Sequence, residues 1–120
     1  MNQIKYTITA ESEDTDFVGN CIASGDDDFD RACEDDIRRQ LESGNVWAWC
    51  VVKVSAHFEG FTGNAYLGAC SYASEKDFLE CDYYASMRVE ARTYLRIAIE
   101  KACEQGEVAK NALTTLKELE

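Results

Sequence analysis

The stretch that decides the fold is Val46–Tyr72, with the sequence VWAWCVVKVSAHFEGFTGNAYLGACSY. It contains two apolar runs rich in β-branched and aromatic residues, separated by the Gly- and Asn-containing segment 59–64. Runs of this kind on either side of a Gly/Asn break are typical of a β-hairpin. We therefore predict strands over about 46–58 and 65–72, which form the centre of one small sheet.

The first of these strands has one strongly apolar face. Every second residue from Val46 to Phe58 is apolar, and this alternation predicts a face that is buried in the core. The opposite face begins with Trp47 and Trp49 and ends in polar residues. Two interpretations of these tryptophans stay open. They pack in the core under a helix, or they anchor a protein interface, where tryptophan is enriched. A homodimer that buries them is one form of the second interpretation.

The flanking sequence predicts one further strand and three helices. Residues 4–10 alternate between apolar and polar, as a half-buried strand does. Apolar residues at steps of three and four predict helices over about 27–43, 82–105 and 107–118, with Gly106 ending the second. Segment 17–22 is either a short strand or irregular. The chain has no proline and shows no linker or repeat, so we predict one domain over 1–120. The fold class is α+β, a small antiparallel sheet with helices packed on one face.

Negative charge is concentrated in the first third of the chain. The formal net charge is −11, and residues 11–36 hold eleven acids and a single base, Arg31. This sign argues against direct binding to nucleic acid or to an anionic membrane. Acids in the first turn of a helix stabilise its dipole, but capping needs only one or two of them. Carboxylates three or four positions apart on a helix lie about 5–6 Å apart, so the excess is also suited to imitating a phosphate backbone.

No motif in the chain predicts catalysis. Six cysteines are scattered singly, and the one histidine, His57, falls on the opposite face of its strand from Cys50. No phosphate-binding loop, dinucleotide-binding or zinc-protease pattern is present. The cluster 26–30 lacks the glycine and the final glutamate of a calcium loop. We predict that the protein is not an enzyme and has no cofactor and no metal. Without a membrane-length apolar run or a secretory signal, we expect free thiols in the cytoplasm.

Two segments carry a resemblance to other proteins. Asn45–Cys50 and Tyr66–Tyr72, followed by Asp77-Phe78, resemble a pattern in small uncharacterised proteins of bacteriophage and prophage genomes. The upstream residues Gly19-Asn20 and Ala23–Asp27 are similar as well. The resemblance implies an accessory protein of a phage or mobile element, and it brings no assigned activity with it.

These observations predict a binding protein. The expected function is that of an acidic, non-enzymatic accessory protein that binds a host protein or ribonucleoprotein complex. It would block a basic nucleic-acid-binding surface there, as an anti-CRISPR or other anti-defence inhibitor does. The alternative is a small-ligand or metal-binding module with a pocket between the sheet and the long helix, lined by Tyr83, Tyr84, Trp49 and Arg88. The predicted partner-binding residues are eight acids and the two tryptophans: Asp14, Asp16, Asp26, Asp27, Asp28, Asp30, Glu34, Asp35, Trp47 and Trp49.

Overall fold

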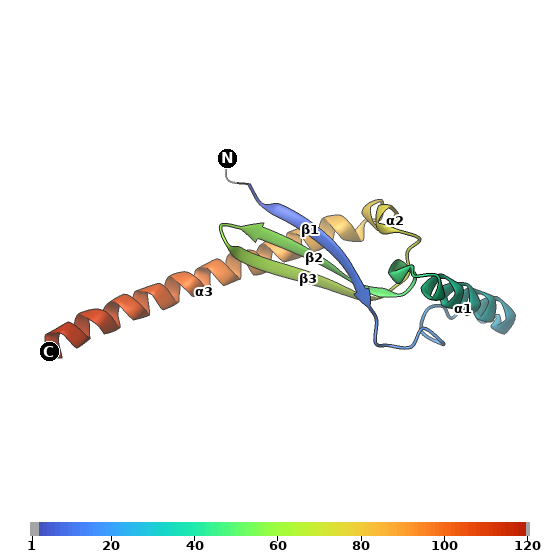
Figure 1. The fold of residues 1–120 in the computed structure, drawn as a ribbon, viewed down its shortest axis with the longest axis horizontal. Helices are drawn as coiled ribbons and strands as arrows, with labels where there is room; N and C mark the ends of the chain where they lie inside the picture. The colour runs from blue at the N-terminus through green and yellow to red at the C-terminus, as the bar shows by residue number, and fades with distance from the viewer. Residues whose placement is uncertain (1–2, 120) are drawn as a thin grey trace.

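Three strands form one antiparallel sheet in the order β1-β2-β3 in the computed structural model (Figure 1). The structure describes residues 3–119, so residues 1, 2 and 120 of the predicted domain lie outside it. The predicted α+β class is confirmed. The elements in chain order are β1 (Lys5–Ser12), α1 (Asp27–Glu42), the 3₁₀ turn η1 (Val46–Ala48), β2 (Cys50–Phe58), β3 (Phe61–Cys70), α2 (Glu75–Leu79) and α3 (Tyr83–Leu119).

The β2–β3 hairpin turns in only two residues. Glu59 and Gly60 have φ angles of 50° and 83°, and Phe58 pairs with Phe61 across the turn. Two-residue turns with positive φ at both positions match the natural twist of a hairpin. The predicted break over 59–64 was therefore too long, because its last four residues belong to β3.

Helix α3 covers one face of the sheet with its first half. Met87, Ala91 and Leu95 are buried against the apolar side of β2 and β3. The helix crosses the sheet at Gly63, where an added Cβ would overlap the backbone N of Leu95 and the carbonyl O of Ala91. Glycine is thus required here by the close approach of two backbones.

The predicted core face of β2 is confirmed. Cys50, Val52, Val54 and Ala56 have no exposed surface. On the opposite face, which no helix within residues 3–119 covers, the side chains near the hairpin end are polar: His57 Nε2 lies 2.9 Å from Thr7 Oγ1, and Ser55 Oγ donates to Asn64 Oδ1 at 2.6 Å. Cys50 and His57 therefore point to opposite sides of the sheet, as their parity predicts.

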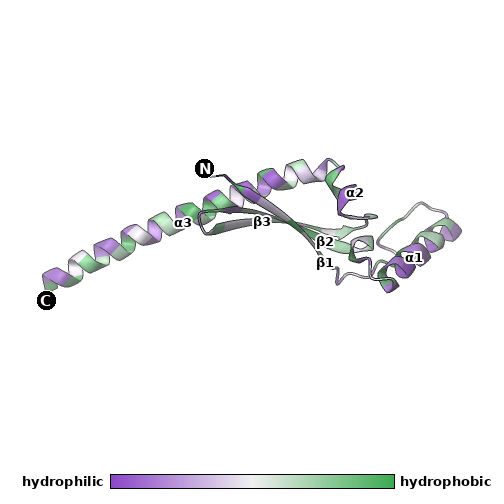
Figure 2. Ribbon diagram, turned by 45° about the horizontal axis from the view of Figure 1, so that its top comes forward, coloured by the Kyte–Doolittle hydropathy of each residue, from purple (hydrophilic) through white to green (hydrophobic). Residues whose placement is uncertain are grey.

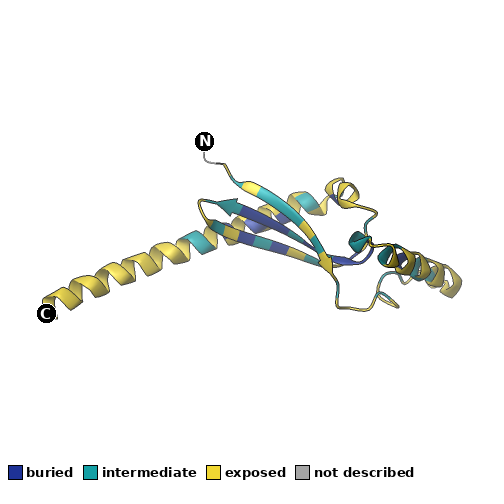
Figure 3. Cartoon of the chain, in the orientation of Figure 1, coloured by how far each residue is buried: buried dark blue, intermediate teal, exposed yellow. Residues whose placement is uncertain are grey.

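The predicted helices 82–105 and 107–118 are one helix. Gly106 lies inside α3, because a single glycine lowers helix stability by only about 1 kcal/mol and the surrounding residues favour helix. From residue 101 to residue 119 every position is exposed (Figure 3). This second half of α3 projects beyond the sheet, and the molecule is consequently 76 Å long and only 33 Å wide.

Helix α1 does not pack on the face of the sheet, contrary to the prediction. It lies beyond one end of the sheet, at the opposite end of the molecule from the C-terminus of α3 (Figure 1). There it forms a small core of its own, in which Ile37 packs with Ala48 and Trp49. The helix bounds themselves agree with the prediction. Asp26 caps the N-terminus, and Gly44, with a φ angle of 95°, follows the C-cap Ser43.

Among the described residues, which include all six cysteines, no disulfide forms. Burial raises the pKa of the Cys50 thiol to about 12, which keeps it protonated and unreactive at neutral pH. None of the helices within residues 3–119 combines the length and apolarity needed to span a membrane.

Candidate protein-binding surface

The acidic end of the molecule consists of residues 11–36, the segment that leaves β1 and enters α1. Its first twenty residues, 11–30, hold eight acids and no base. They lie at the extremity that carries α1 (Figure 1), and Figure 2 shows hydrophilic residues along much of that helix. The density of negative charge is therefore highest at one tip of an elongated protein.

The long loop between β1 and α1 is anchored rather than free. The indole Nε1 of Trp49 donates to the carbonyl O of Thr15 at 2.6 Å. Phe17 packs on the α1 core, and the guanidinium of Arg38 lies 5.4 Å above the centre of its ring. Segment 17–22 forms a turn, in which the carbonyl of Phe17 accepts from the N–H groups of residues 20 and 21. The irregular alternative for this segment is thus the one that the structure shows.

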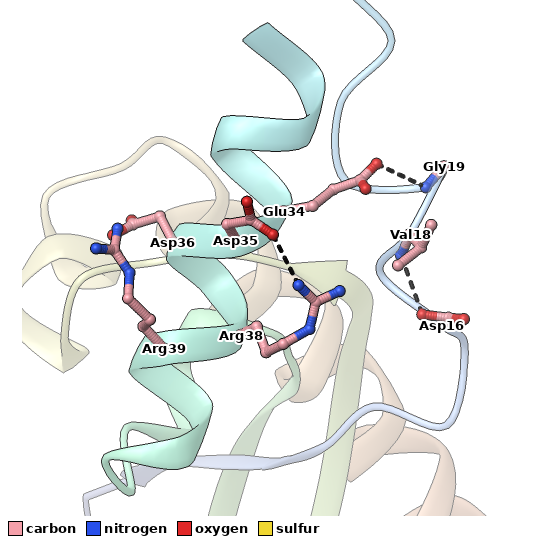
Figure 4. Close-up of polar contacts among 8 residues, drawn as sticks. All are labelled: Asp16, Val18, Gly19, Glu34, Asp35, Asp36, Arg38 and Arg39. Atoms are coloured by element: carbon pink, nitrogen blue, oxygen red, sulfur yellow. Dashed lines mark hydrogen bonds and ion pairs between the residues drawn. The ribbon is translucent and has the colours of Figure 1, made fainter. Parts of the chain in front are cut away.

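Four of the predicted partner-binding acids hold this loop in place. Asp16 accepts from the backbone N–H of Val18 at 3.0 Å, and Glu34 reaches from α1 to the N–H of Gly19 at 3.2 Å (Figure 4). Asp26 accepts from the N–H groups of residues 28 and 29 as the N-cap of α1. Asp30 accepts from the hydroxyl of Ser24 at 2.6 Å. These carboxylates satisfy backbone and hydroxyl donors, so their first role is structural.

Two further acids are partly neutralised along α1. Asp35 pairs with Arg38 at 2.8 Å, and its neighbour Asp36 pairs with Arg39 at 3.1 Å (Figure 4). All four side chains are about half exposed or more, so each pair contributes little to stability. Their effect at this surface is to reduce its net charge near the middle of α1.

Of the eight predicted acids, the remaining three are available to a partner, and Glu11 near the end of β1 is likewise exposed. Asp14, Asp27 and Asp28 are exposed, and their carboxylates make no hydrogen bond or ion pair with any side chain or backbone group in residues 3–119. Asp14 comes from the loop, and Asp27 and Asp28 form the first turn of α1, which starts at the rigid Asp26 cap. We call Asp14, Asp27 and Asp28 the unpaired acids.

The two tryptophans do not belong to this exposed surface. Trp49 is 4% exposed and lies inside the α1 core, so its prediction as a surface anchor was wrong. Trp47 is half-buried, and its ring centre lies 5.9 Å from that of Phe78 and 6.4 Å from that of Tyr72. The 3₁₀ turn η1 breaks the strand alternation at Val46–Ala48 and directs the two indoles into different clusters. Core packing is the correct interpretation for both.

Glu13 has a role that the sequence did not predict. Its carboxylate reaches across the end of the sheet and accepts from the backbone N–H of Ala69 at 2.7 Å. That hydrogen bond, together with one from the N–H of Thr15, lowers the pKa of Glu13. Ala69 has a positive φ angle of 54° beside the irregular pairing of β2 and β3 near Cys50. Nothing in the local sequence around Glu13 or Ala69 indicates this contact.

The four residues predicted to line a small-ligand pocket do not come together in the structure. Trp49 packs on α1, whereas Arg88 lies 4.7 Å above the ring of Tyr84 and 6.0 Å above that of Tyr6. A different hollow, of about 300 Å³, lies between the far end of the sheet and α3. No three metal-binding side chains converge anywhere in the part of the chain that the structure describes.

Comparison with protein-family models, with curated proteins and with solved structures finds no match to this chain. The function is therefore inferred from the acidic end of the molecule.

Proposed function

We propose that this chain is a non-catalytic binding protein whose acidic end docks on the basic, nucleic-acid-binding surface of a partner. The observation that supports it is the set of unpaired acids. Three exposed carboxylates lie at a tip where residues 11–30 contain no base, while four other acids there, including Glu34 and Asp30, accept hydrogen bonds from local donors. Carboxylates in that state attract arginine and lysine side chains, which are the groups that line nucleic-acid-binding grooves.

Rigidity of the acidic end favours recognition over a mere increase in solubility. The Trp49–Thr15 hydrogen bond and the Asp26 cap hold the loop and the helix start in one arrangement. A partner therefore meets carboxylates whose backbone is already ordered, so less conformational entropy is lost on binding. Asp27 and Asp28 also lie in the first turn of α1, at the end of the molecule opposite the C-terminus of α3 (Figure 1).

The partner class follows from charge. A basic groove that normally holds DNA or RNA presents cations at phosphate spacing, and negatively charged protein tips compete for it. We propose a host nucleic-acid-binding complex as the partner and the host cytoplasm as the compartment. Inhibition of a defence complex such as a CRISPR effector is the function that unites this chemistry with the resemblance to phage proteins.

The proposal predicts salt-sensitive competition with nucleic acid. Purified nucleic-acid-binding defence complexes, each loaded with a fluorescent DNA or RNA duplex, are titrated with the protein, and the release of the duplex is followed by anisotropy. We expect release from at least one complex, with an apparent affinity that falls steeply as salt increases because exposed ion pairs are screened. If no complex releases its duplex at low salt, or if release does not depend on salt, the proposal is wrong.

A further inference from the structure

The apolar face of α3 that packs on the sheet continues along the helix beyond the end of the sheet. Ala91 and Leu95 are buried by the sheet. On the same helical face, at steps of three and four, the stripe then runs through Ile99, Ala102, Gly106, Ala109, Leu113 and Leu116. The sheet ends near Ile99, whereas the stripe runs on for nearly five more helical turns. We call these six residues, Ile99 to Leu116, the α3 stripe.

Nothing in residues 3–119 covers the stripe beyond Ile99 (Figure 3). Leu113 is 54% exposed and Leu116 is 52% exposed, and Leu119, three residues further on, is 80% exposed. Most of the stability of a helix in a protein comes from packing of its apolar face, and this part of α3 has no such packing. An uncovered apolar stripe on such a helix marks a protein interaction surface.

We propose that the α3 stripe pairs with the same stripe of a second copy, antiparallel, about a two-fold axis at Gly106. The order of side chains is nearly symmetric about that glycine. Ile99 and Leu113 lie seven residues on either side of it, and Ala102 and Ala109 lie four and three residues away. A two-fold interface requires such self-complementarity, because a residue on one side of the axis meets the residue at the mirrored position of the second copy, as Ile99 meets Leu113 here. Small residues at the centre of the stripe let the two helices approach closely, and the large side chains of Ile99 and Leu113 pack against each other on both sides of that centre.

The hollow between the sheet and α3 lies where the partner helix would end. Its apolar lining is Ile4, Phe58, Leu95 and Ile99, and its rim is formed by Arg92, Arg96 and Glu100. With the axis at Gly106, Leu116 of the second copy comes level with residues 95 and 96 of the first. The hollow, of about 300 Å³, has room for that leucine, so each copy would bury the helix end of the other.

Charge opposes pairing of two copies less at this place than at the acidic end. Segment 100–119 holds four acids and three bases, whereas the whole chain carries −11. The acidic end lies at the opposite extremity of the molecule (Figure 1). Antiparallel pairing through the α3 stripes places the two acidic ends at opposite extremities of the dimer, so that repulsion between them is small.

Light scattering on the eluting peak of a size-exclusion column tests the pairing. We expect the unmodified chain to have twice the 13.5 kDa mass of one chain, across a concentration series. The double variant Leu113→Glu, Leu116→Glu is expected to elute with the mass of one chain. The matched variant Asn111→Glu, Thr114→Glu adds the same charge to the outer face of the helix and is expected to stay dimeric. A monomeric unmodified chain, or a dimer that survives both leucine substitutions, overturns the proposal.

Cross-linking tests the antiparallel direction independently. In a Cys103→Ser background, Gln105→Cys places a thiol next to the two-fold axis, and a short bismaleimide is expected to join two copies there. Leu119→Cys in the same background is expected not to cross-link, because antiparallel helices hold the two positions about 40 Å apart at 1.5 Å per residue. Cross-linking at residue 119, or its absence at residue 105, contradicts the arrangement. The background without an added cysteine measures reaction at the five remaining, less exposed thiols.

Discussion

Replacing Gly63 with alanine is expected to lower the free energy of unfolding by more than about 3 kcal/mol, above the usual cost of overpacking a core. The added Cβ would meet backbone atoms of α3, including the Cα of Leu95 at 2.7 Å. A helix backbone cannot rotate away as a side chain does, so α3 must lift from the sheet. Urea denaturation followed by the fluorescence of the two buried or half-buried tryptophans measures the change.

Gly68→Ala is the matched control on the same strand. A Cβ at Gly68 would approach only the carboxylate oxygen of Glu13, at 3.1 Å, and that flexible side chain can shift. We expect the control to change the free energy of unfolding by less than about 1 kcal/mol. Equal effects of the two substitutions would mean that the crossing of α3 over β3 is not as close as the structure shows.

Trp49→Ala is expected to lower the free energy of unfolding by about 3–5 kcal/mol, the usual range for removing a buried aromatic side chain. Trp49 is 4% exposed, packs against Ile37, and holds the loop through its hydrogen bond to Thr15. Its loss removes most of the core that attaches α1 to the end of the sheet. Denaturation measures the stability, and limited proteolysis of the loop 13–26 reports local release of the acidic end.

The variant Trp49→Phe distinguishes the contribution of the aromatic ring to stability from that of the Trp49–Thr15 hydrogen bond. Phenylalanine keeps an aromatic ring in the α1 core but cannot donate to the carbonyl of Thr15, so a loss of about 1 kcal/mol is expected for the missing bond, in addition to any loss of packing. If Trp49→Ala were as stable as the unmodified chain and failed only in partner binding, Trp49 would be an interface anchor and the account of the α1 core would be wrong.

The elements that local periodicity specifies were predictable from the sequence. Alternation over β1 and β2 predicts their faces correctly, and the apolar spacing predicts α1 to within one residue at its C-terminal end. Both signals arise from residues that are near neighbours in the chain, so a single sequence contains them.

Two glycines show where local signals mislead. Gly63 resembles a turn residue but lies inside β3, where the backbone of α3, some thirty residues later, excludes a side chain. Gly106 resembles a helix stop but lies inside α3 with no atom near its Cβ position. The role of each glycine depends on what approaches it in space, and the local sequence does not contain that information.

The candidate site was predictable as a region but not as a set of residues. Counting charges along the sequence locates the acidic end. It does not distinguish Glu34, whose carboxylate accepts a hydrogen bond from the N–H of Gly19, from Asp27 and Asp28, whose carboxylates accept none within residues 3–119. That distinction depends on how the loop folds back on α1, a tertiary arrangement. The structure thereby reduces eight predicted acids to the three unpaired ones.

The most direct test of the docking proposal compares two charge-matched triple variants in the duplex-release assay. Asp14→Asn, Asp27→Asn, Asp28→Asn removes the unpaired acids, and Glu104→Gln, Glu107→Gln, Glu118→Gln removes three exposed charges from the far half of α3. Three exposed ion pairs of about 0.5 kcal/mol each predict about a tenfold loss of competing affinity for the first variant and little change for the second. Equal affinity of the first variant and the unmodified chain, or equal losses in both variants, would contradict binding through the acidic end.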